Sequence, residues 1–230
     1  MVDFADLFNP RKRGMTPRAE ELRGRKLTRH EQEAGQPWDA SYHGGGAPWD
    51  IGGPQPAVVQ LASAGVFVGA VLDAGCGTGD NALCIAARGG HVFGFDVAPT
   101  AVSIAREHAA AEGLDAEFAV ADALDLGQLG HSFDTVLDCA LFHALDAEER
   151  QTYVAGLRSV TNPGGRLYLL CFADSNTEPT GPHPVRQREL REPFEGAGGW
   201  KIESISRERL FARFAPDGLP AWLLIAGAAR

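Results

Sequence analysis

Short apolar runs alternate along most of this chain with stretches in which apolar residues recur at helical spacing. The runs predict seven β-strands, and the stretches between them predict helices, several of which begin at proline or aspartate. The predicted strands span residues 66–72, 91–96, 116–121, 133–139, 166–172, 200–206 and 221–228. The predicted helices span residues 54–64, 80–88, 99–112, 146–160 and 185–195.

This alternation of strands and helices indicates an α/β protein with a doubly wound, mostly parallel seven-stranded sheet. We expect the last two strands to pair as a hairpin across the loop Pro216-Asp217-Gly218. A chain of 230 residues suits a single domain of this kind, and we place that domain at residues 57–230.

The first 56 residues have a different composition from the domain. Residues 1–35 are polar, charged and poorly periodic, which predicts a flexible N-terminal arm. Residues 36–56 are rich in glycine and proline, yet they contain Trp38 and Trp49, two of the four tryptophans. Exposed disordered segments seldom contain such aromatics, so we expect residues 36–56 to fold over a substrate site as an N-terminal lid.

The charge of the chain is uneven. The net charge is −9, whereas residues 11–30 carry +6, so the rest of the chain is strongly acidic. An acidic body repels the phosphates of nucleic acid, so we expect a small-molecule partner instead. The basic segment is interpreted as a solvated helix, with a tail for an anionic partner as the alternative. The sequence leaves open whether the protein is a monomer or a homodimer.

The expected location is the cytoplasm. No apolar run is long enough to span a bilayer, and the N-terminus lacks the apolar region of a secretory signal. The four cysteines form no C-x-x-C pair and lie in or beside apolar runs, which is typical of reduced core thiols: Cys76, Cys84, Cys139 and Cys171. The histidines show no metal-ligand spacing, and we expect no metal site.

Three alternate glycines follow the first predicted strand, in Val71-Leu72-Asp73-Ala74-Gly75-Cys76-Gly77-Thr78-Gly79-Asp80. Glycine permits a tight turn and lets a ligand lie against the backbone, so a nucleotide-type site is predicted here. In a dinucleotide fingerprint the third glycine would fall at position 80, which is Asp80. A carboxylate there opposes a pyrophosphate, whereas S-adenosylmethionine has no phosphate and offers an amino group that Asp73 can face.

The heptad D-A-G-C-G-T-G at 73–79 resembles the first motif of the class I S-adenosylmethionine-dependent methyltransferases. The resemblance implies a Rossmann-like methyltransferase fold, S-adenosylmethionine as cofactor and S-adenosylhomocysteine as product. Asp96 follows the last glycine at a spacing that suits the ribose hydroxyls, and Asp122 resembles the family acid that faces adenine. The expected cofactor-binding residues are Asp73, Gly75, Cys76, Gly77, Gly79, Asp96, Val97, Asp122, Ala123 and Asp138.

The segments 48–56, 140–145 and 169–174 resemble those of a small-molecule branch of this family. That branch includes thiopurine-methyltransferase-like proteins, halide or thiol methyltransferases, and mycobacterial enzymes that methylate heterocyclic toxins such as hydroxyquinolones. An aromatic wall for a flat acceptor is predicted at Trp38, Tyr42, Trp49 and Phe142, with plain core packing as the alternative.

His143 follows the fourth predicted strand and is the candidate general base, which would also contact the acceptor. Its alternative is a local packing or hydrogen-bonding role, because a thiolate, a halide or an acidic hydroxyl needs no base.

The predicted function is methyl transfer to O, N or S of a small aromatic or heterocyclic acceptor that is hydroxyquinolone-, phenol- or quinol-like, in detoxification or secondary metabolism. Halide, thiol or quinone-pathway methyl transfer is the nearest alternative. Two different classes also stay open, an NAD-dependent oxidoreductase and a non-catalytic module that senses the cofactor.

Overall fold

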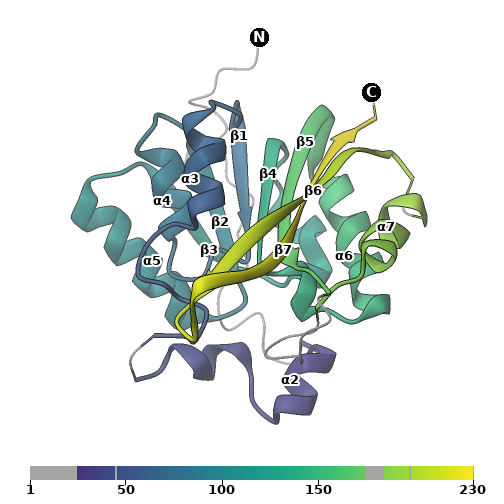
Figure 1. Ribbon diagram of the computed structural model, residues 1–230. Helices are drawn as coiled ribbons and strands as arrows, with labels where there is room; N and C mark the ends of the chain where they lie inside the picture. Colours follow the sequence, from purple (N-terminus) through teal and green to yellow (C-terminus); the bar gives the residue numbers. More distant parts are fainter. Residues whose placement is uncertain (1–24, 45, 175–183, 197, 230) are drawn as a thin grey trace.

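The computed structural model describes residues 25–44, 46–174, 184–196 and 198–229. A single seven-stranded sheet forms its centre, with strand order β3-β2-β1-β4-β5-β7-β6 (Figure 1). All pairs are parallel except those of β7, which is antiparallel to both neighbours. The strands are β1 (Ala70–Ala74), β2 (His91–Asp96), β3 (Ala116–Val120), β4 (Phe133–Cys139), β5 (Thr161–Phe172), β6 (Trp200–Ala212) and β7 (Ala215–Ala228). The predicted fold class is confirmed.

Helices cover both faces of the sheet (Figure 1). The α-helices are α2 (Arg29–Ala34), α3 (Pro56–Ser63), α4 (Asp80–Ala86), α5 (Pro99–Glu112), α6 (Ala147–Ser159) and α7 (Gln187–Gly196). The 3-10 helices are η1 (Trp38–Tyr42), η2 (Ala123–Leu129) and η3 (Phe142–Ala144). Within the described residues, no helix has the length and apolar character to cross a bilayer.

Adjacent strand residues point to opposite faces, and this alternation builds two cores. Val71 faces the core under α3, α4 and α5, whereas Leu72 faces the core under α6 and α7. Because both faces are buried, most residues of the parallel strands are apolar, which made the strands recognisable in the sequence.

The β6–β7 hairpin is longer than the sequence predicted, and its expected turn position is wrong. The chain reverses at residues 213–214, and Pro216 to Gly218 belong to β7. Two features accommodate these turn-type residues within a strand. The pairing shifts between Leu210 and Ala212, and a Cβ on Gly218 would lie 3.1 Å from the Phe211 ring, so glycine leaves room for that ring.

The N-terminal segment differs from the expected arm where the structure describes it. Residues 1–24 of the expected arm lie outside the described residues, but residues 25–35 include helix α2. Thr28 caps this helix, and the Glu31 side chain accepts a hydrogen bond from the Thr28 amide in return. This capping box is visible in the sequence as T-x-x-E. Both side chains are buried, so the segment is held against the domain.

Candidate functional site

A deep cleft opens at the carboxyl ends of β1, β2, β3 and β4, and it holds about 1350 Å³ of space including its open mouth. Its walls come from the strand ends, from the segment 38–55 and from the tip of the β6–β7 hairpin. In Figure 1, α2 and the tip of the β6–β7 hairpin both lie at the lower edge of the sheet. The position is the one at which doubly wound sheets bind ligands.

The glycine turn after β1 forms one wall of the cleft. Gly75 and Gly77 line it and have positive φ angles of 70° and 53°. A Cβ on Gly75 would lie 2.6 Å from Leu141 Cδ1, so no larger residue fits there. Gly79 is not among the lining residues, because its missing side chain makes room for Ala105 and Phe118 instead. Gly79 therefore allows the start of α4 to pack closely against Ala105 and Phe118.

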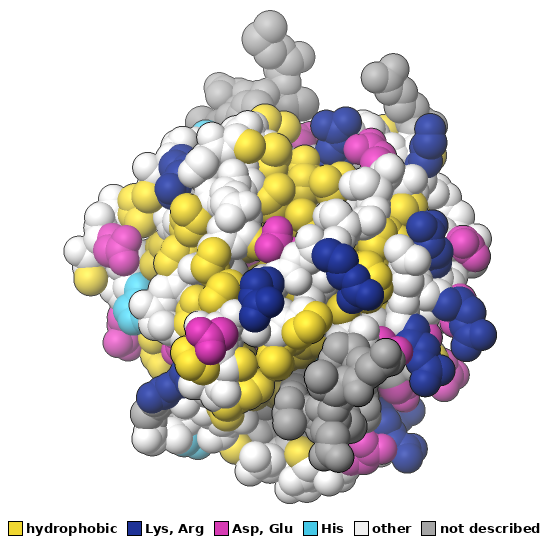
Figure 2. Space-filling model, viewed as in Figure 1, with side chains coloured by type: hydrophobic (Ala, Val, Ile, Leu, Met, Phe, Trp, Pro, Cys, Tyr) yellow, Lys and Arg dark blue, Asp and Glu magenta, His cyan; other side chains and the backbone are white. Residues whose placement is uncertain are grey.

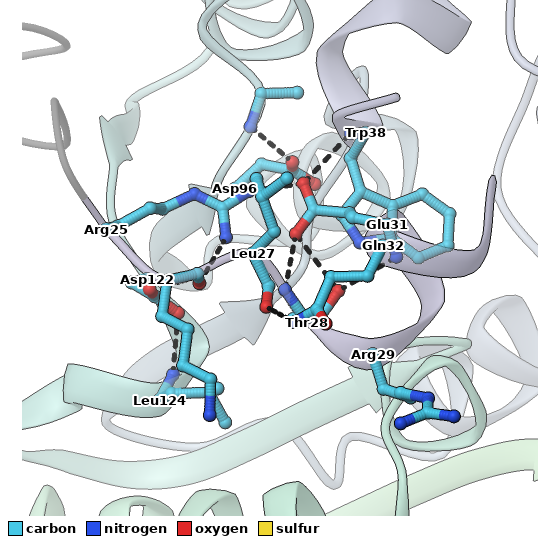
Figure 3. A network of polar contacts seen from close by, with 12 residues as sticks. Arg25, Leu27, Thr28, Arg29, Glu31, Gln32, Trp38, Asp96, Asp122 and Leu124 are labelled. Atoms are coloured by element: carbon cyan, nitrogen blue, oxygen red, sulfur yellow. Dashed lines mark hydrogen bonds and ion pairs between the residues drawn. The ribbon is translucent and has the colours of Figure 1, made fainter. Parts of the chain in front are cut away.

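Two acids at the strand ends face the cleft. Asp96 accepts hydrogen bonds from the amides of Gly77 and Ala98, each at 2.9 Å, and so joins the end of β2 to the glycine turn. Asp122 accepts one from the Leu124 amide at 2.9 Å (Figure 3). The neighbours Val97 and Ala123 and the adjacent Cys76 also line the cleft.

Arg25 lies at the same end of the cleft, and the sequence analysis did not single it out. Its guanidinium pairs with the buried carboxylate of Glu31 (Figure 3). Among the described residues, Arg25 is the only lysine or arginine that lines the cleft. This cation is already paired with Glu31, so it offers no free charge to a ligand phosphate.

Asp73 and Asp138 are buried behind the glycine turn and do not line the cleft. Neither Asp73 oxygen has a hydrogen-bond partner within the described part of the chain. Burial, and then the nearby charge of Asp138, raise the pKa of Asp73 to about 7. Burial also raises the pKa of Asp138 to about 7, although its carboxylate accepts bonds from Tyr153 Oη and the Leu141 amide. An orphan buried carboxylate of this kind favours a cationic partner.

The predicted aromatic wall is present in part. Trp38, Tyr42 and Trp49 line the cleft; the Trp49 ring stands edge-on to the other two, and its Nε1 donates to Tyr42 Oη at 3.2 Å. Phe142 does not reach the cleft, because it is fully buried in the core and its ring lies 4.9 Å below the Arg150 guanidinium. The expectation that Phe142 contacts a substrate is therefore corrected to a packing role.

His143 lines the cleft and is 3% exposed. Its Nδ1 accepts a hydrogen bond from the Phe172 amide at 3.2 Å, and its ring stacks on the Phe172 ring at 4.5 Å. Because that bond uses the Nδ1 lone pair, the neutral ring carries its proton on Nε2. In this arrangement Nε2 is a hydrogen-bond donor.

Several cleft residues were missed from the sequence. They are Arg25, Thr28, Ile51, Gln55, Leu210, Phe211 and Phe214. For the hairpin residues a signal was present, since two phenylalanines flank Ala212-Arg213 beside a chain reversal. Gln55 left no such signal, because its partner lies 156 residues away.

The fold and the cleft define an α/β protein with a ligand-sized cleft at the carboxyl edge of a doubly wound sheet. Residues 71–165 match the family described as "Methyltransferase domain". The chain is 39% identical over 168 residues to the 2-heptyl-1-hydroxyquinolin-4(1H)-one methyltransferase of Mycobacteroides abscessus, covering 72% of this chain and 73% of that protein.

Two solved structures are also similar to this chain. The first comes from work on the conversion of a disulfide bond into a thioacetal group during echinomycin biosynthesis. It is 38% identical to this chain with a TM-score of 0.73, and the match covers 83% of this chain and 89% of that chain. Magnesium protoporphyrin IX methyltransferase from Synechocystis PCC 6803 with bound S-adenosylmethionine has a TM-score of 0.59 and 25% identity, covering 75% and 76%. The chain belongs to the class I S-adenosylmethionine-dependent methyltransferases.

Proposed function

We propose that this protein methylates an O, N or S atom of a small, flat aromatic or heterocyclic acceptor of the hydroxyquinolone kind. The observation that carries the proposal is a cleft with two chemically different ends. The acids Asp96 and Asp122 lie at the ends of β2 and β3, on one side of β1 in the sheet, whereas His143 and Phe172 lie after β4 and at the end of β5, on the other side. Leu210 of the hairpin packs with Phe172. The similarity to the hydroxyquinolone methyltransferase supports the choice of acceptor.

The acidic end is assigned to the cofactor, with Gly75, Cys76, Gly77, Val97 and Ala123 as its backbone wall. Asp96 accepts hydrogen bonds from ribose hydroxyls, and Asp122 faces the adenine amino group. The orphan carboxylate of Asp73 is matched to the ammonium group of the methionine part. Asp138 acts indirectly, because its bonds to the Leu141 and Phe142 amides hold the turn after β4.

The other end is assigned to the acceptor. S-adenosylmethionine supplies an electrophilic methyl group: the acceptor lone pair forms the new bond to carbon as the carbon–sulfur bond breaks, and S-adenosylhomocysteine leaves. Methyl transfer needs alignment and a dry site. Trp38, Tyr42 and Trp49 line the cleft, with Tyr42 and Trp49 packed beside Gly77 and Ala98, so they exclude water from the cofactor side of the cleft. His143 orients the acceptor by donating a hydrogen bond from Nε2, and the acceptor proton, where present, passes to solvent.

The organisation expected from the sequence is kept as part of the proposal. Residues 36–56 serve as the lid, residues 57–230 as the methyltransferase domain, and residues 1–35 as an N-terminal arm, whose described part, residues 25–35, includes helix α2. We propose a cytoplasmic monomer or homodimer without a nucleic-acid partner, in line with the net charge of −9. A light-scattering measurement of mass and a DNA-binding assay test these points.

A sulfur acceptor is the second candidate. The similar structure from echinomycin biosynthesis concerns conversion of a disulfide bond into a thioacetal group. A thiolate needs no base, which suits the donor role of His143.

The proposed function is tested in two steps. Calorimetry should show S-adenosylmethionine binding to the purified protein, and an acceptor panel read by S-adenosylhomocysteine release should favour N-hydroxy or hydroxy heterocycles. The panel also includes thiols, halides and quinols, and preferential methylation of one of these would replace the proposed acceptor class. NADH binding without S-adenosylmethionine binding would overturn the proposal as a whole.

The pH dependence of cofactor binding tests the role of Asp73. Its pKa of about 7 means that the free protein holds a proton there at lower pH. If the ammonium group of the cofactor requires the ionised carboxylate, affinity falls as the pH drops below about 7, by up to about tenfold per unit. Asp73→Asn is expected to remove this dependence and to bind more weakly at about pH 8.

Asp73→Asn should weaken cofactor binding but raise the stability of the ligand-free protein. A carboxyl with a raised pKa in the folded state binds more protons folded than unfolded, so its contribution to stability declines as the pH rises towards that pKa. Asp73→Asn should therefore raise the melting temperature of the ligand-free protein more at about pH 8 than at about pH 5. An unchanged melting temperature at both pH values would contradict this picture of an orphan buried charge.

A further inference from the structure

The tip of the β6–β7 hairpin forms an apolar wall of the cleft that the chemistry of methyl transfer does not require. Leu210, Phe211 and Phe214 line the cleft from this tip, and Ile51 lines it from the lid. Figure 2 shows hydrophobic side chains gathered around the tip in the same view as Figure 1. Phe214 is 50% exposed, so the wall runs from the interior out to solvent.

This wall is continuous with the place assigned to the reacting atom. Leu210 packs in a small core with Phe172 and Leu170. The Phe172 ring in turn stacks on His143. An apolar path therefore leads from His143 past Leu210 to the exposed end of the hairpin.

The tip is held in place by Gln55, which is 7% exposed. The Gln55 side chain donates from Nε2 to the Phe211 carbonyl at 2.9 Å and accepts from the Phe211 amide at 3.0 Å. One side-chain amide thus satisfies both backbone groups of a strand residue, as a neighbouring strand would. A second link, from the Arg213 amide to the Pro48 carbonyl at 3.0 Å, joins the tip to the lid.

The ring of Phe211 is also fixed from the opposite side. A Cβ on Gly218 would lie 3.1–3.2 Å from three of its ring atoms, so the ring rests on the bare backbone of that glycine. The wall is therefore built by specific contacts on both sides of Phe211, which is what a selective binding surface needs.

We infer that the hairpin tip, clamped by Gln55, is a subsite for an apolar side arm of the acceptor, such as an alkyl chain attached next to the methylated atom. This inference rests on the proposed function and adds to it the part of the acceptor that is recognised. Arm-bearing acceptors bind in the subsite by burying their chain against Phe211 and Phe214. Gln55 is a positioning residue, since it holds Phe211 and contributes through it.

The test measures how much an alkyl arm adds to affinity. The probes are 2-heptyl-1-hydroxyquinolin-4(1H)-one and the same ring without the heptyl chain, titrated into protein saturated with S-adenosylhomocysteine. The native protein should bind the heptyl compound at least about tenfold more tightly, as burial of several methylene groups implies. Gln55→Met and Phe214→Ala should each reduce this advantage by about threefold or more, with little change for the bare ring.

Matched controls lie elsewhere on the same fold. Gln60→Met changes an exposed glutamine of α3, and Val68→Ala shortens an exposed apolar side chain at the opposite edge of the sheet. Both variants should bind the heptyl compound more tightly than the bare ring by the same factor as the native protein. Because Phe214 is half exposed, its replacement is expected to leave folding intact even if Gln55→Met lowers stability.

Two results would overturn the inference. In the first, the native protein binds the two probes with equal affinity or binds neither. In the second, Phe214→Ala binds the heptyl compound more tightly than the bare ring by the same factor as the native protein. The proposed function is judged separately, because it stands or falls on S-adenosylmethionine binding and on turnover in the acceptor panel.

Discussion

Replacement of Asp96 by alanine is expected to weaken S-adenosylmethionine binding by about 10- to 100-fold, the range that corresponds to about 1.5–3 kcal/mol for hydrogen bonds to a charged group. The carboxylate lies at the end of β2, lines the cleft and is 8% exposed. Its two oxygens already fix the Gly77 and Ala98 amides, so ribose hydroxyls meet an acceptor whose orientation is set in advance. Calorimetric titration of the cofactor measures the loss.

Two comparison variants separate binding from folding. Asp96→Asn keeps one oxygen and the shape of the side chain, so it should lie between the native protein and Asp96→Ala in affinity. Asp115→Ala removes an exposed carboxylate that precedes β3, at the edge of the sheet away from the cleft, and should bind as the native protein does. A folded Asp96→Ala protein with native affinity would remove Asp96 from the cofactor site.

The sheet and the glycine turn were predictable because both depend on local sequence. Strands buried on both faces are mostly apolar, as in the run Val71-Leu72 of β1 and Val136-Leu137 of β4, and a chain turning at positive φ favours glycine, as at Gly75. The acids at the strand ends follow from the same argument, since parallel strands bring their carboxyl ends to one edge.

The acceptor side was less predictable because it depends on contacts between distant segments. Phe142 and His143 are adjacent in sequence, yet one enters the core and the other lines the cleft. The two side chains point in different directions because both residues belong to the short 3-10 helix η3. No periodic pattern of apolar residues in the sequence predicts this helix. Gln55 and Phe211 meet only because the hairpin bends back over the lid, and Arg25 enters the site only because α2 is capped and docked.

Contacts within the sheet and contacts between distant segments build different parts of the cleft. In the proposed assignment, the cofactor end is built from the strand ends together with Tyr42 and Trp49 of the lid. The proposed acceptor end takes residues from the hairpin tip and from the rest of the lid, which are joined by the Gln55 side chain and the Pro48 carbonyl. Changes in the hairpin can therefore alter the acceptor without disturbing the cofactor. This is the arrangement expected of a fold that serves many acceptors with one methyl donor.

A series at His143 should decide whether its ring accepts or donates a proton. We expect His143→Gln to retain kcat/KM within about threefold of the native value, because glutamine can accept from the Phe172 amide and donate to the acceptor from the same amide group. His143→Ala removes both bonds and should lower kcat/KM by about tenfold or more. Initial rates of S-adenosylhomocysteine release, measured across pH, supply the values.

A general base would give a different pattern. Glutamine cannot take a proton, so both variants would then lose activity together, by about 10²- to 10⁴-fold, and the native enzyme would show an acid limb in kcat/KM that His143→Gln lacks. The observed bond to Nδ1 argues for the donor role, since in the neutral ring it leaves the proton on Nε2. An acceptor that is anionic before it binds, such as an ionised N-hydroxyl or thiol, needs a donor of this kind to hold it in line with the methyl group.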